Sequence, residues 1–134
     1  MDRRAIGGRA MKQLEHDEQC TLMKWWALAC HVFSVPESLL FAIPNGGERN
    51  VIVASRLKAE GVRAGVPDLF LAVPHGNLGG LFIEMKKAKG GRVSPNQKSM
   101  INELKSRGYA ASVCHGWMEA SAAIENYLKG ENAC

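Results

Sequence analysis

The sequence lacks long apolar runs. No window of its 134 residues approaches the roughly 18 uninterrupted apolar residues of a membrane-spanning helix. The first residues, Met1 to Arg4, lead into glycines and charged residues, not into the apolar core of a signal peptide. We therefore expect a cytoplasmic protein. Because 46% of the residues are hydrophobic and 22% are charged, we expect one globular domain over residues 1–134, with a flexible arm at 1–9 and a tail at 130–134.

Closely spaced cysteine and histidine pairs are also missing. The four cysteines form no Cys-x-x-Cys pair, and the four histidines form no His-x-x-x-His pair. A zinc site would need residues distant in the chain to converge, and nothing in the sequence indicates this. The cysteines lie inside apolar runs or at the terminus, so we expect free, reduced thiols.

Acidic residues are absent from residues 85–102, although the formal net charge of the chain is only +4. A segment with one sign of charge can face the phosphates of a nucleic acid. Lysines in a loop also serve solubility alone, so the charges leave both interpretations open. The basic residues of this segment are Lys86, Lys87, Lys89, Arg92 and Lys98.

Hydrophobic periodicity and turn residues predict eight helices and strands. Ser94 and Pro95 give the clearest boundary, an N-cap followed by a proline in the first helical position. The order predicts an α/β fold with a mixed sheet between helices, because a strand-helix-strand unit requires a parallel crossover. The expected elements are a helix from about Leu14 to His31, a strand Leu39–Ile43, a helix Val51–Lys58, strands Leu69–Val73 and Leu81–Lys86, a helix Gln97–Arg107, a strand Tyr109–Cys114 and a helix Trp117–Leu128.

The two central strands carry the residues with the clearest chemistry. A hairpin centred near Gly76 would set Asp68 opposite Glu84. Opposed side chains have Cβ atoms roughly 4.5–5.5 Å apart, and two carboxylates at that separation repel unless a cation lies between them. Side chains alternate along a strand, so Lys86 shares a face with Glu84 while the flanking apolar residues point toward a core.

This pattern predicts a metal-dependent phosphodiesterase site. Magnesium prefers oxygen ligands, which Asp68, Glu84 and the backbone carbonyl of Met85 could supply. The Lys86 ammonium would orient the attacking water or stabilise charge in the transition state. An acid-x-Lys string also occurs by chance, where it is usually a solvated surface ion pair.

The motifs resemble those of the VRR-NUC branch of the PD-(D/E)xK nucleases, over nearly the whole chain. The resemblance implies a restriction-endonuclease-like fold and a Mg²⁺- or Mn²⁺-dependent DNA endonuclease in which Asp68, Glu84 and Lys86 are catalytic. An acid on the first helix would complete the metal site. The segments that carry the resemblance are Glu15 with Gln19, Ile43–Gly47, Gly61–Leu69, Gly80–Lys86, Ser94–Gln97 with Leu104, and Gly108–Tyr109.

The helix acid is Glu15 in this interpretation, because its spacing to Gln19 matches the family. Glu18, one turn further along, is the competing candidate. The alternative role for both acids, which Asp17 is also expected to play, is to complement the helix dipole. That role does not require the spacing to Gln19.

Further residues are expected near the substrate. Gln97 would point back from its helix toward the active site and hold the nucleophilic water, Lys86 or a phosphate. Asn45 could contact DNA, although an Asn-Gly pair is explained equally well as a turn. Lys87, Lys89, Arg92 and Lys98 are the remaining candidates for DNA binding. The tryptophans Trp25, Trp26 and Trp117 are expected to pack in the core.

The resemblance also suggests the substrate. Small stand-alone phage or bacterial members fit a homodimer that cleaves four-way (Holliday) DNA junctions in DNA repair within a bacterial cell. A flap, nick or restriction-like endonuclease acting on other DNA is an alternative. A DNA-binding module without catalysis is another.

Overall fold

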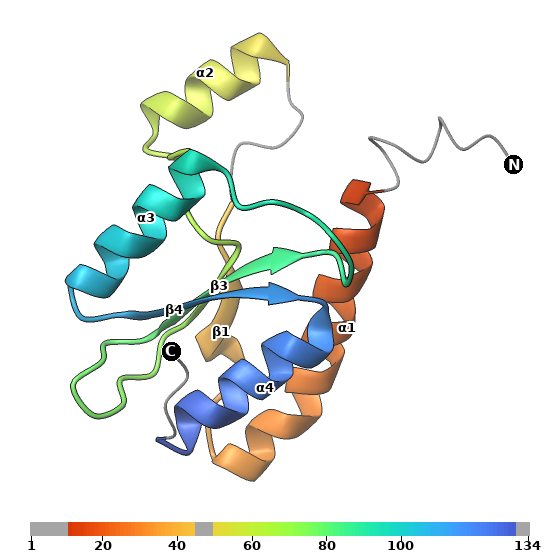
Figure 1. Cartoon of the computed structure of the whole chain (residues 1–134), viewed down its shortest axis with the longest axis vertical. Coiled ribbons are helices and arrows are strands. Elements are labelled where there is room, and N and C mark those ends of the chain that lie inside the picture. The colour runs from red at the N-terminus through yellow and green to blue at the C-terminus, as the bar shows by residue number, and fades with distance from the viewer. Residues whose placement is uncertain (1–10, 45–49, 131–134) are drawn as a thin grey trace, which may run out of the picture.

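The computed structural model describes residues 11–44 and 50–130. The order and type of the predicted helices and strands are confirmed, with one short addition, the 3-10 turn η2. Three residues are too few to give a periodic signal in the sequence. The elements are α1 (Met11–Phe33), η2 (Glu37–Leu39), β1 (Leu40–Ala42), α2 (Val51–Ala59), β2 (Leu69–Leu71), β3 (Leu81–Lys86), α3 (Pro95–Ser106), β4 (Ala110–His115) and α4 (Trp117–Leu128) (Figure 1).

The four strands form one mixed sheet in the order β1-β2-β3-β4. β2 pairs antiparallel with both β1 and β3, whereas β3 pairs parallel with β4. The parallel pair is joined by α3, which is the crossover that the sequence predicts. The α/β fold with a mixed sheet flanked by helices is therefore confirmed.

The main core lies between the sheet and the pair α1 and α4, which pack against each other (Figure 1). Trp26 of α1 is fully buried there, and its indole nitrogen donates a hydrogen bond to the carbonyl of Glu37 at 2.9 Å. Trp25 and Trp117 pack partly buried against the same core, so the packing role predicted for the tryptophans is confirmed. The core includes Leu22, Cys30, Leu69, Leu71, Leu81, Ile83, Met85 and Ile124.

The opposite face of the sheet carries α3 (Figure 1). Aromatic rings of β2 and β3 and of Tyr109 form a row on the sheet. Phe70 stacks on Phe82 with ring centroids 4.3 Å apart, and Phe82 meets Tyr109 edge-on at 5.4 Å. Because side chains alternate along β3, Phe82 shares its face with Glu84 and Lys86. The polar residues of β3 therefore lie on the α3 side of the sheet.

Several boundaries differ from the predictions. α1 already includes Met11, so its first turn contains no acid, and a dipole role for Glu15, Asp17 and Glu18 is wrong. The helix extends beyond the first apolar residue of the periodic pattern, which periodicity alone cannot reveal. β1 and β2 are three residues each, shorter than expected, and β4 extends to His115. No described helix has the length and apolar character needed to cross a bilayer.

Candidate active site

The register of β2 and β3 brings Asp68 and Glu84 together. Leu69 lies opposite Ile83, and the next pair along the same register is Asp68 with Glu84. Asp68 Oδ2 accepts a hydrogen bond of 2.7 Å from the backbone nitrogen of Met85. This bond fixes the Asp68 carboxylate across the ladder, and the predicted hairpin register is confirmed.

Glu84 and Lys86 are buried on the α3 side of the sheet, with 3% and 7% of their surface exposed. Lys86 Nζ lies 3.2 Å from Glu84 Oε2. The interpretation of this string as a solvated surface ion pair is therefore wrong. Burying such an ion pair costs desolvation energy, and well-packed apolar residues in its place are often as stabilising or more so. We therefore expect the pair to have a function besides stability.

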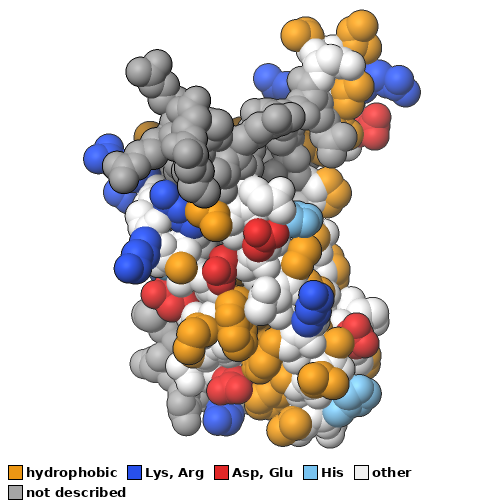
Figure 2. Space-filling view, turned by 90° about the vertical axis from the view of Figure 1, so that its right-hand side faces the viewer, with side chains coloured by type: hydrophobic (Ala, Val, Ile, Leu, Met, Phe, Trp, Pro, Cys, Tyr) orange, Lys and Arg blue, Asp and Glu red, His pale blue; other side chains and the backbone are white. Residues whose placement is uncertain are grey.

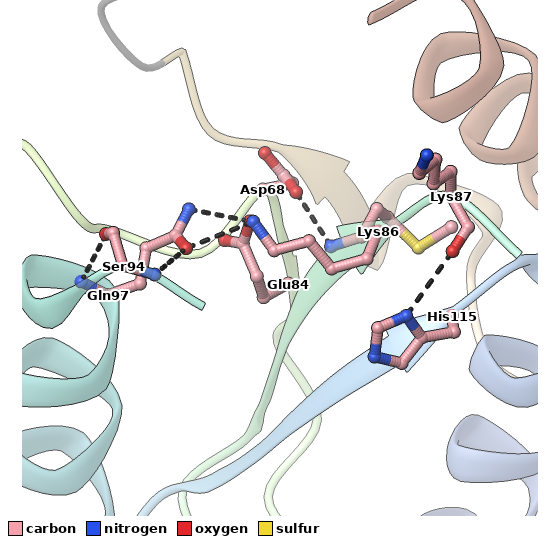
Figure 3. Close-up of polar contacts among 8 residues, drawn as sticks. Asp68, Glu84, Lys86, Lys87, Ser94, Gln97 and His115 are labelled. Atoms are coloured by element: carbon pink, nitrogen blue, oxygen red, sulfur yellow. Dashed lines mark hydrogen bonds and ion pairs between the residues drawn. The ribbon is translucent and has the colours of Figure 1, made fainter. Parts of the chain in front are cut away.

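Gln97 joins both of these side chains to α3 (Figure 3). Its Nε2 donates to Glu84 Oε2 at 3.0 Å, and its Oε1 accepts from Lys86 Nζ at 3.0 Å. The same Oε1 accepts from the backbone nitrogen of Ser94 at 2.9 Å, while Ser94 Oγ caps the nitrogen of Gln97 at 3.1 Å. The expected direction of Gln97 is confirmed, and the capping box of α3 is part of the site.

The second oxygen of the Glu84 carboxylate, Oε1, is buried and has no hydrogen-bond partner among the described residues. Burial, and after it the nearby charge of Asp68, raise the pKa of Glu84 to about 7, although Lys86 opposes both effects. The charged form of Glu84 thus lacks full compensation within the described chain. A buried, poorly compensated carboxylate beside a second carboxylate is an arrangement that a cation would stabilise.

The Met85 carbonyl is directed toward the same place. In an extended strand the N–H and C=O of one residue point to the same side, and the Met85 N–H points to Asp68. The carbonyl of the next residue, Lys86, points to the other side, where it accepts from Gly116 at 3.0 Å. The register sets Met85 opposite Pro67, which has no N–H to donate to the Met85 carbonyl.

The structure separates the two candidate acids of α1. Glu18 Oε1 accepts a 2.7 Å hydrogen bond from the nitrogen of Trp117, the first residue of α4. Gly116, the N-cap of α4, offers no side chain, so Glu18 supplies the missing cap. Glu15 instead has a pKa raised by burial, with Lys86 lowering it and Asp68 raising it. Glu15 is therefore within electrostatic reach of the site.

Glu15 does not join Asp68 and Glu84 in a tight cluster. Among the described residues, no three His, Cys, Asp or Glu side chains converge closely enough to hold a metal ion. The donors that do meet are Asp68, Glu84 and the Met85 backbone. These are hard oxygen ligands, which fit Mg²⁺ or Mn²⁺ and not a soft metal.

Of the expected DNA-binding residues, Asn45 is outside the described residues. Lys89, Arg92 and Lys98 are exposed, and Lys87 is partly buried. The sequence analysis missed His115, which pairs with Lys86 across β3 and β4 and has Nδ1 3.3 Å from the Lys87 carbonyl (Figure 3). Its position at the end of a strand parallel to β3 was the only signal available.

A mixed sheet that sets two opposed carboxylates beside a lysine, next to a basic segment, fits the nuclease class that the sequence predicts. The comparisons with known proteins agree. The model of the VRR-NUC domain family matches residues 9–118, and the chain belongs to this family of DNA-binding nucleases. A solved structure described as a VRR_NUC domain protein is 30% identical, with a TM-score of 0.73, over 86% of this chain and 88% of that one. No curated protein matches the sequence.

Proposed function

We propose that the chain is a divalent-metal-dependent DNA endonuclease that acts as a homodimer on branched DNA, with four-way junctions as its main substrate. The observation that carries the proposal is the buried Glu84 carboxylate, whose Oε1 has no partner among the described residues while Asp68 stands opposite. This arrangement supports a cation site between two strands.

Asp68, Glu84 and the Met85 carbonyl would hold Mg²⁺ or Mn²⁺, with Glu15 as a further carboxylate from α1. Such an ion, when bound, lowers the pKa of a coordinated water and neutralises charge on a phosphate. Its binding also favours the charged form of Glu84, which burial otherwise disfavours. The ligand set is therefore consistent with the electrostatics of the site.

Lys86 would act on the attacking water. Its ammonium is held by Glu84 at 3.2 Å and Gln97 at 3.0 Å, which directs the remaining N–H donor outward from these two partners. A donor placed in this way stabilises negative charge on the nucleophile or on the reacting phosphate. Gln97 would keep Lys86 and Glu84 in position, and Lys87, Lys89, Arg92, Lys98 and Asn45 would contact the DNA.

A homodimer would place two sites on strands related by a two-fold axis, as resolution of a four-way junction requires. An exposed apolar surface on α1 supports association of this kind. Leu28 is 77% and Val32 82% exposed, beside a groove that Glu125 and Lys129 of α4 also line. Opposite charges near an apolar centre suit a surface that meets its own copy. Figure 2 shows hydrophobic side chains gathered over the lower part of this side of the molecule.

Cleavage of a panel of labelled DNAs tests the proposal. Four-way, flap, nicked and linear duplexes are incubated with Mg²⁺, Mn²⁺ or chelator, with the wild-type protein and with Lys86→Ala. We expect metal-dependent cleavage, fastest on the four-way junction, and its loss in the variant. Equal cleavage of all DNAs would contradict junction selectivity. Binding without any metal-dependent cleavage would instead favour a non-catalytic module.

A further inference from the structure

α2 is the least covered helix of the described chain. It has nine residues and none is buried, and it makes no substantial contact with another helix or strand. Its Leu57 lines a pocket together with the turn at Val62–Ala64, and the Val62 nitrogen donates a hydrogen bond of 3.0 Å to the Leu57 carbonyl. Its first turn exposes Val51 by 85% and Ile52 by 72%. Isolated helices shorter than about 12 residues are marginal in water, so a helix exposed in this way suggests a surface that a ligand covers.

The charge of this surface identifies the kind of ligand. Arg56 and Lys58 are exposed in the later turns of α2, and Arg63 is exposed in the following turn. Glu60 is the sole acid between residues 50 and 65. This basic surface would repel the same surface on a second copy of the chain, whereas the negative charge of a phosphate backbone complements it.

The position of α2 connects this surface to the active site. A Cβ on Gly65 would lie 2.6 Å from the carbonyl oxygen of Asn96, so the chain after α2 rests directly on the first turn of α3. Gln97, which bonds Glu84 and Lys86, is the next residue of that turn. Figure 1 shows α2 beside the N-terminal end of α3. DNA seated in the active site would therefore pass close to α2.

We propose that α2 recognises the branch point of the DNA. Val51 and Ile52 would pack against a base exposed where stacking is interrupted, and Arg56 and Lys58 would hold the flanking phosphates. Apolar side chains placed between base steps are an established means of engaging distorted DNA. Ile52 and Arg56 are one turn apart, about 6 Å along the helix, which is close to two base steps. The inference rests on the proposed binding of branched DNA.

Binding in chelator tests this role without requiring cleavage. The affinities of wild type and of Val51→Ala/Ile52→Ala are measured by fluorescence anisotropy on a four-way junction and on a linear duplex of the same sequence. A 2-aminopurine at the branch point reports unstacking. We expect the wild type to raise the 2-aminopurine fluorescence on binding the junction. The double variant should bind the junction about tenfold more weakly and give no such rise, while its affinity for the duplex is unchanged. Alanine favours helix, so α2 is preserved.

Two further variants define the controls. Arg56→Ala/Lys58→Ala should weaken binding to both DNAs and reduce the slope of log affinity against log salt by about two, because two phosphate contacts are lost. Leu78→Ala removes an apolar side chain, 37% exposed, from the distant β2-β3 connection and should change neither affinity.

Three results would overturn the inference. The first is equal loss of junction and duplex affinity in Val51→Ala/Ile52→Ala, and the second is a wild type without junction preference. The third is a fall in the mass of this variant from dimer to monomer, which would assign the surface to a second copy. A wild type that binds the junction but cleaves nothing would remove the proposed endonuclease and leave α2 as the branch-binding element.

Discussion

Glu84 carries a charge that its protein neighbours only partly balance. Lys86 contacts one oxygen of the carboxylate and also bonds Gln97, while Oε1 is buried without a partner among the described residues. Asp68 adds a second negative charge nearby. A structural ion pair would be better compensated, so this imbalance is the main physical argument for a cation at the site.

The raised pKa of Glu84 predicts a pH-dependent stability in the metal-free protein. Its folded-state pKa of about 7 lies above the ordinary value of 4.5, so neutral Glu84 contributes stability that is fully present below pH 4.5. This stability is lost as the pH rises through about 7 and amounts to roughly 3 kcal/mol. Urea unfolding in chelator should therefore give a free energy of unfolding that falls between about pH 5 and pH 8.

Glu84→Gln is the matched control for this prediction, because it keeps the shape of the side chain but does not ionise. Its free energy of unfolding should vary less over the same range. Mn²⁺ should restore the free energy of unfolding of the wild type at pH 8, because the ion binds the charged Glu84 carboxylate. Identical pH dependence in the two proteins would show that Glu84 does not have the raised pKa.

Lys86→Ala should separate catalysis from binding. Removal of a donor that stabilises transition-state charge typically lowers turnover by about 10²–10³-fold. Affinity for uncleaved DNA should change little, because Lys86 is 7% exposed and bonded to Glu84 and Gln97. Single-turnover rates and anisotropy give the two quantities. Lys89→Ala, at an exposed site, should instead weaken DNA binding and leave the single-turnover rate nearly unchanged. If Lys86→Ala loses as much affinity as rate, a catalytic role for Lys86 is contradicted.

At the scale of elements, the start of α3 combines helix stability with the site. Ser94 caps the helix through Gln97 N, and the Gln97 side chain returns to the Ser94 nitrogen while holding Lys86. Asn50 caps α2 in a similar way, accepting from Val53 N at 2.8 Å, but its helix holds none of these residues. The two caps therefore form a natural comparison.

Ser94→Ala and Asn50→Ala should each cost about 1 kcal/mol of stability, the usual value of an N-cap. Only Ser94→Ala should also lower kcat on linear duplex DNA, because Gln97 then loses the bond that fixes its helical turn. Unfolding curves and steady-state kinetics measure both effects. Equal kcat values in the two variants would mean that the cap and the active site are independent.

Features of the site that follow from local rules could be predicted from the sequence, whereas features that depend on contacts between distant residues could not. The register of Asp68 and Glu84 follows from alternation about Gly76, and the start of α3 follows from Ser94-Pro95, because both are local rules. The cap that Glu18 gives α4 joins residues 99 positions apart, so no local pattern reveals it. His115 was missed for the same reason, since its approach to Lys87 depends on the parallel pairing of β3 with β4.

At the scale of the whole molecule, cleavage of a four-way junction needs two active sites in one particle. The single chain has a mass of 14.6 kDa, so analytical ultracentrifugation should give twice this value. We expect the dimer to persist at moderate salt, because the exposed residues of α1 that support it, Leu28 and Val32, are apolar. A monomer at all concentrations, with DNA bound or not, would contradict junction resolution by a pair while leaving the nuclease assignment intact.

Calorimetric titration of Mn²⁺ at pH 8 into the wild type, Asp68→Asn and Glu84→Gln tests the central claim most directly. At this pH Glu84 is mostly charged, since its pKa is about 7. If the two strands hold a cation between them, the wild type binds Mn²⁺ and each variant loses most of that affinity. Equal binding by all three proteins, or none by the wild type, would contradict a metal site formed by Asp68 and Glu84.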